Sequence, residues 1–180
     1  MKPKQIFYAI VAMLILCIPT SCDTEDDDTI KEEDLYNYAS SAMLNCCLDI
    51  YNQNIAGTPT GSKDMTVNGP SGGTVIIKGN TSVSDNTINS VDLTYTMMNV
   101  KYVYKQSSYT VEITMNGSLN EKGTFKTDYK SETFSSTNLS IEAKMYSDSK
   151  SGEFSNMGEV NLTCTISKVV GYMFGHTIAY

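Results

Sequence analysis

The sequence predicts a mainly β protein in which an N-terminal helix packs on an antiparallel sheet of about eight strands, as a sandwich or a half-closed barrel. Two patterns predict this fold class. Residues 31–54 carry apolar side chains at a spacing of three to four, which is typical of a helix with one buried face. Beyond residue 60, apolar and polar residues alternate, which indicates strands buried on one side. A chain of 180 residues is long enough for one domain with its own core.

The predicted helix opens with three carboxylates, at residues 32–34, which suit the positive end of a helix dipole. Its apolar stripe includes Leu35, Ala42, Cys46 and Ile50. Glycine and proline within residues 55–61 end the helix.

The strands follow from alternation and from the turn-forming clusters between them. We expect them within residues 65–67, 74–78, 91–104, 109–119, 125–129, 139–145, 160–166 and 172–180. A slip of the alternation at Met97-Met98 predicts a β-bulge or a strand break. Residues 106–108 are predicted to close a hairpin. Asn116-Gly117 is placed within a strand, and the next turn at residues 120–123.

The N-terminus has the pattern of a secretion signal. Lys2 and Lys4 precede an uncharged stretch at residues 6–18, which is shorter than the roughly 20 residues that a spanning helix needs. We therefore divide the chain into a signal peptide at 1–21, an acidic tether at 22–34 and a single helix-plus-sheet domain at 35–180.

The junction after the apolar stretch carries a candidate lipid attachment. Ser21 directly before Cys22 resembles the lipobox of bacterial lipoproteins, although Pro19 stands where that pattern usually has Leu, Val or Ile. The resemblance implies that Cys22 becomes the first residue and is acylated. The alternative is ordinary secretion with a cleaved peptide and a chance cysteine.

The tether is strongly acidic, since residues 23–34 hold eight acids and one lysine. Physically this run is a solvated, self-repelling linker. It also resembles the export signal of surface-exposed lipoproteins of Bacteroidetes. That resemblance implies an outer-membrane location facing outward, with the membrane as partner through the lipid. Asp28-Thr29-Ile30 is similar to the O-glycosylation motif of that phylum, which implies glycosylation at Thr29.

Composition and motifs exclude several function classes. The formal net charge of −7 and the absence of arginine disfavour nucleic-acid binding. One histidine rules out a histidine-rich metal site, and we expect His176 to be a hydrogen-bonded core residue. Residues 69–73 fit G-x-S-x-G, but a strand follows where a nucleophile elbow needs a helix. We therefore predict no catalytic residues, no metal and no cofactor.

Tyrosines provide the remaining binding signal. Tyr95, Tyr102 and Tyr104 are the candidate binding residues of an aromatic surface, although tyrosine also packs well in strands. The leading hypothesis is a non-catalytic binding or accessory module for a glycan, a protein or a small apolar ligand. The alternatives are a structural or assembling component of the cell envelope and, third, a carboxylate-based hydrolase.

Three cysteines remain after processing at Cys22. Cys46 and Cys164 both occupy apolar phases, and export places them in an oxidising compartment, so we predict a Cys46–Cys164 disulfide with Cys47 free. The alternative is three reduced, buried thiols.

Overall fold

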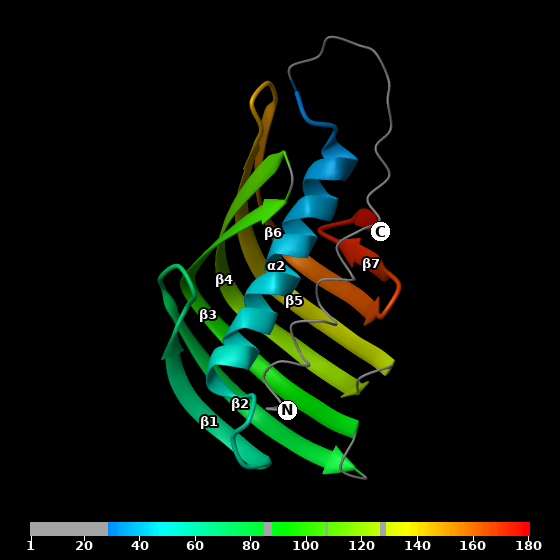
Figure 1. Cartoon of the computed structure of the whole chain (residues 1–180). Coiled ribbons are helices and arrows are strands. Elements are labelled where there is room, and N and C mark those ends of the chain that lie inside the picture. Colours follow the sequence, from blue (N-terminus) through cyan, green and yellow to red (C-terminus); the bar gives the residue numbers. More distant parts are fainter. Residues whose placement is uncertain (1–28, 85–87, 107, 127–128) are drawn as a thin grey trace.

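The computed structural model describes residues 29–84, 88–106, 108–126 and 129–180. In these residues one helix, α2, packs on a single antiparallel sheet whose eight strands follow chain order (Figure 1). The elements are α2 Glu32–Asn54, β1 Gly61–Asn68, β2 Thr74–Ser84, β3 Ile88–Gln106, β4 Tyr109–Lys126, β5 Tyr129–Tyr146, β6 Ser151–Thr165, β7 Val169–Met173 and β8 His176–Ala179. The predicted fold class is confirmed. The sheet is continuous and curls without closing.

Helix α2 lies across the concave face of the curled sheet (Figure 1). Its buried stripe follows the predicted periodicity, because Ala42, Cys46 and Ile50 are each 0% exposed. The sheet contributes alternate residues of its strands to the same core. The concave face is therefore packed with side chains and with the helix.

The sheet curls because its ladders contain bulges. The pairing of β3 with β4 shifts between Met97 and Val100, where the predicted slip is confirmed as a bulge with Asn99 at a φ of 50°. The pairing of β5 with β6 shifts between Ser136 and Leu139. Each bulge also changes which residues of its strand face the helix.

The turn predicted at residues 120–123 is wrong, because β4 continues through it to Lys126. The alternation along β4 is unbroken from Met115, so Leu119 and Glu121 face the core in the same phase. Gly123 allows β4 and β5 to approach closely, since a Cβ there would lie 2.2 Å from the carbonyl oxygen of Ser131. The return strand β5 contains the strand predicted at 139–145, whereas the strand predicted at 125–129 begins in β4 and ends at the first residue of β5.

The C-terminal segment predicted as one strand is a hairpin. Strands β7 and β8 meet at a turn in which Phe174 and Gly175 have φ values of 53° and 88°. Glycine adopts such values at little cost, which explains the reversal at this point.

Both outer strands of the sheet carry features that hinder strand addition. On β1, Lys63 points inward, is 7% exposed and donates to Thr58 Oγ1 at 2.9 Å. On β8, the amide of Ala179 donates to Asn37 Oδ1 of the helix at 3.3 Å. Inward-pointing charges and covering elements both block edge-to-edge pairing. These features weigh against assembly through the two sheet edges.

The end of the tether joins the folded unit. Thr29 is exposed and forms an isolated parallel bridge with Ser151, and the amide of Ile30 donates to the carbonyl of Ser151 at 3.4 Å. Cys22 lies outside the described residues. Within the part of the chain that is described, helix α2 lacks the length of apolar sequence needed to cross a membrane.

Candidate functional site

The three tyrosines predicted as binding residues lie between the sheet and the helix. Tyr95 is 0% exposed and Tyr104 is 8% exposed. Tyr102 is half-buried and donates its hydroxyl to Asp49 Oδ2 of α2 at 2.9 Å. The structure thus corrects the proposed aromatic surface. These rings face inward because their strand phase is the one that the helix covers.

A group of buried polar residues, which we call the acid cluster, lies in the same core. It consists of Tyr95, Glu121, Lys130 and Glu132. Tyr95 Oη donates to Glu121 Oε2 at 2.5 Å, and Lys130 Nζ lies 2.9 Å from Glu132 Oε2. Glu121 and Glu132 are only 6% and 5% exposed. The sequence missed this cluster because residues 120–123 have the composition of a turn.

Burial is the main electrostatic influence on the acid cluster. Burial first and the nearby Glu132 second raise the pKa of Glu121, and Tyr95 and Lys130 act in the opposite direction, so that its net pKa is about 8. Burial lowers the pKa of Lys130, but the ion pair with Glu132 outweighs it and the net shift is upward. Near neutral pH the cluster therefore holds a protonated Glu121 beside a Lys130–Glu132 ion pair.

This arrangement bears on the hydrolase hypothesis. Two carboxyl groups that differ in protonation resemble an acid and base pair. A hydrolase also needs its carboxyl groups within reach of the substrate and of water. Both acids are almost fully buried, so the acid cluster fits a role in packing better than one in hydrolysis.

The predicted Cys46–Cys164 disulfide is absent, because Cys46, Cys47 and Cys164 are free and buried. Neighbouring helical residues point about 100° apart, so only one of the two helix cysteines can face a given strand. Burial chiefly raises the pKa of Cys47, and Cys164 is among the groups that raise it further. Cys47 and Cys164 lie in the same core and are 1% and 2% exposed.

His176 packs at the start of the helix. Its ring stacks on Tyr36 with centroids 3.8 Å apart, and Nε2 lies 3.7 Å from Glu32 Oε1. Among the described residues, no group of three or more histidine, cysteine or acidic side chains is placed to hold a metal.

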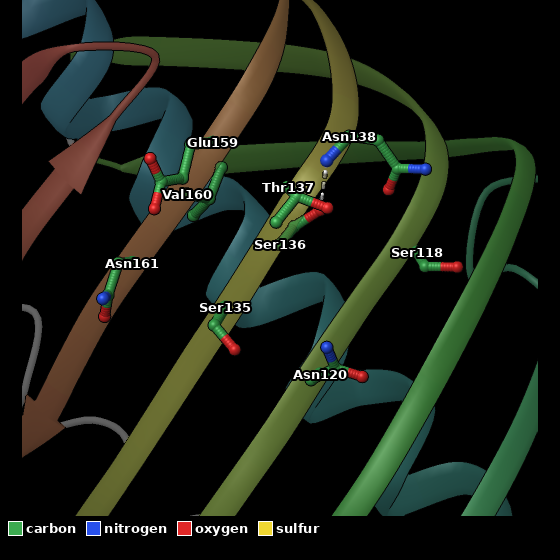
Figure 2. Close-up of a pocket in the computed structure, with 9 residues that line it drawn as sticks. All are labelled: Ser118, Asn120, Ser135, Ser136, Thr137, Asn138, Glu159, Val160 and Asn161. Atoms are coloured by element: carbon green, nitrogen blue, oxygen red, sulfur yellow. Dashed lines mark hydrogen bonds between the residues drawn. The ribbon is translucent and has the colours of Figure 1, made fainter.

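The opposite, convex face of the sheet carries a polar hollow over β4, β5 and β6, which we call the outer-face hollow (Figure 2). Its volume is about 160 Å³. The ladder between β4 and β5 is interrupted here, between Asn116 and Asn120, which separates the strands locally. The lining residues are Ser118, Asn120, Ser135, Ser136, Thr137, Asn138, Glu159, Val160 and Asn161.

The described lining of the outer-face hollow is almost entirely uncharged. Hydroxyl and amide side chains dominate it, and Glu159 is its one carboxylate. Glu159 Oε1 accepts from the hydroxyl of Tyr172, on the neighbouring β7, at 2.6 Å, and this hydrogen bond raises the pKa of Tyr172. The half-buried ring of Tyr172 thereby stands beside the hollow. This set of groups suits a ligand rich in hydroxyls.

Sequence reasoning did not find the outer-face hollow. Its signal is the run of Ser, Thr and Asn at outward positions, which a serine- and threonine-rich β protein carries on every strand. Comparison of the chain with known protein families, with curated proteins and with solved structures found no match.

Proposed function

We propose that this chain is a lipid-anchored module of the outer cell surface that binds glycans without chemical turnover. The outer-face hollow carries this proposal, because it is open and, apart from Glu159, is lined by uncharged residues, most of whose side chains both donate and accept hydrogen bonds. A small apolar ligand fits less well, since the helix and its buried stripe occupy the concave face.

The chemistry of the lining matches that of sugars. A sugar hydroxyl donates one hydrogen bond and accepts others, and asparagine side chains offer both functions from one amide. Asn120 on β4 and Asn161 on β6 are exposed on the two sides of β5 that face the hollow (Figure 2). The ring of Tyr172 supplies an apolar face against which a pyranose can stack.

Replacing either amide should weaken glycan binding. We expect Asn161→Ala and Asn120→Ala each to lower affinity by roughly fivefold to tenfold, the effect of losing one net hydrogen bond. Array screening with purified chain identifies the glycan, and titration calorimetry then measures the variants. Asn68→Ala, an exposed asparagine at the end of β1, is the matched control. The proposal fails if the wild type binds no glycan, or if the control loses affinity equally.

The anchor is tested separately. Cys22→Ala should move the chain from the membrane fraction to the soluble fraction, because each buried acyl methylene contributes about 0.8 kcal/mol to membrane binding. Cys17→Ala is the control and should stay membrane-bound. Mass spectrometry of the N-terminal peptide gives a second readout. A Cys22→Ala chain that remains fully membrane-bound, without any lipid mass in the wild type, would place the anchor elsewhere.

A further inference from the structure

Polar residues on the convex face line up from strand to strand. Thr94 pairs with Asn120, Asn120 with Ser135, and Ser135 with Asn161. The line continues from Asn161 to Tyr172 and from Tyr172 to Thr177. We call this set the outer-face row: Thr94, Asn120, Ser135, Asn161, Tyr172 and Thr177.

Alternation places each member on the face away from the helix. The row members on β3, β4, β5 and β6 are each flanked along their own strand by two buried residues, as Asn120 is by Leu119 and Glu121. Figure 2 shows Asn120, Ser135 and Asn161 side by side on three neighbouring strands. The outer-face hollow is thus the middle of a longer polar line.

The length of the row is set by strand spacing. Neighbouring strands lie about 4.8 Å apart, so the five steps from β3 to β8 cover roughly 24 Å. One step is comparable to the length of one pyranose unit in an extended chain. The row therefore offers one set of polar groups for each successive sugar.

The charge of the row is also informative. No member is ionised near neutral pH, and at the β2 end the neighbouring Lys78 is paired with Asp64 at 3.4 Å. Glu159 lies beside the centre of the row and brings a negative charge to the hollow. An anionic sugar would meet that carboxylate.

From this placement, and resting on the proposed function, we infer that the ligand is a neutral, linear polysaccharide that lies across the strands along the outer-face row. The hollow holds the central units, and Tyr172 stacks on a unit to one side. Recognition is of the interior of the chain, so a free chain end is not needed.

Chain length provides the test. With linear glucose, mannose and xylose oligomers of one to eight units, affinity should rise with each added unit and level off at about five or six, the number of strands crossed. Capping the reducing end should leave affinity unchanged. Full affinity for a monosaccharide, or a requirement for a free end, overturns the inference while leaving glycan binding intact. Absence of binding to every glycan, on the array and among the oligomers, overturns the proposed function itself.

Substitutions in the row on either side of the hollow add a second readout. Thr94→Ala and Tyr172→Ala should weaken binding of the hexamer but not of a dimer seated in the hollow. Thr66→Ala, on the exposed face of β1, is the control. Glu159→Gln should narrow the preference for neutral over uronate oligomers by roughly fivefold at low salt. Equal loss for dimer and hexamer would confine the ligand to the hollow and contradict the row.

Discussion

Replacing Glu121 with glutamine is expected to stabilise the fold at alkaline pH while changing it little in acid. The pKa of Glu121 rises from its ordinary 4.5 to about 8 in the folded chain, so the folded state binds this proton more tightly than the unfolded state. Stability from this group is complete below pH 4.5 and is lost as the pH rises through about 8. The loss amounts to several kcal/mol, at most about 5. Glutamine stays neutral at every pH, so the variant does not undergo this loss of stability.

The measurement is urea unfolding between pH 5 and pH 9. The wild type should lose stability between pH 5 and about pH 8, whereas Glu121→Gln should show a flatter profile, so that the advantage of the variant grows with pH and is complete near pH 8. Glu112→Gln is a close control, because Glu112 also accepts a tyrosine hydroxyl, from Tyr146 at 2.8 Å, but is exposed. Parallel profiles for the wild type and Glu121→Gln would contradict a protonated, buried Glu121.

Much of the fold was predictable because its determinants are local. The helix follows from the spacing of Leu35, Ala42 and Ile50, and the structure places it at Glu32–Asn54. The bulge in β3 is visible in the sequence because the apolar phase changes at Met97. Phase and periodicity act over a few residues, which a sequence displays directly.

The buried Glu121 was not predictable because its placement depends on pairing between strands, which carries β4 through a segment that looks like a turn. Glu121 lies in a polar run with the composition of a turn, but β4 continues through this run and keeps the inward phase of Met115 and Leu119. Residue type alone favours exposure for glutamate. A buried glutamate therefore becomes visible only when the ladders are known.

The same limit applies to the tyrosines. Tyr95 and Tyr172 have equal propensity for strands, and the sequence favoured Tyr95 for binding. The helix covers Tyr95, and the hairpin at Phe174 and Gly175 leaves Tyr172 beside the hollow. Which ring is accessible thus depends on the position of the helix and of a turn, both tertiary properties.

Because the concave face is filled, the ligand binding that we propose is assigned to the convex face. Curled sheets often enclose a ligand, but here the helix and the acid cluster use that volume for the core. Fixed strand spacing then makes the convex face a regular array of polar groups. An extended repeating ligand suits such an array better than a compact one.

The second large effect is expected at Lys130, whose substitution by methionine should destabilise the fold by about 3 kcal/mol near pH 7. Its ammonium compensates the carboxylate of Glu132 at 2.9 Å, and the two side chains are 21% and 6% exposed. Without it, a buried carboxylate remains uncompensated beside Glu121. Protonation of that carboxylate in the variant removes its charge. The loss of stability should therefore be smaller at pH 5 than at pH 8.

A double-mutant cycle with Glu132→Gln isolates the ion pair, because Lys130→Met/Glu132→Gln removes both charges and should regain most of the lost stability. Lys122→Met is the matched control. Lys122 is also paired, with Asp92 at 3.0 Å, but both of these side chains are mostly exposed, so its loss should change little. Urea unfolding of the four chains and the control at pH 5 and pH 8 gives the answer. A loss at Lys130→Met that is independent of pH and unrelieved by Glu132→Gln would show that the lysine acts through packing of its aliphatic stem and not through its charge.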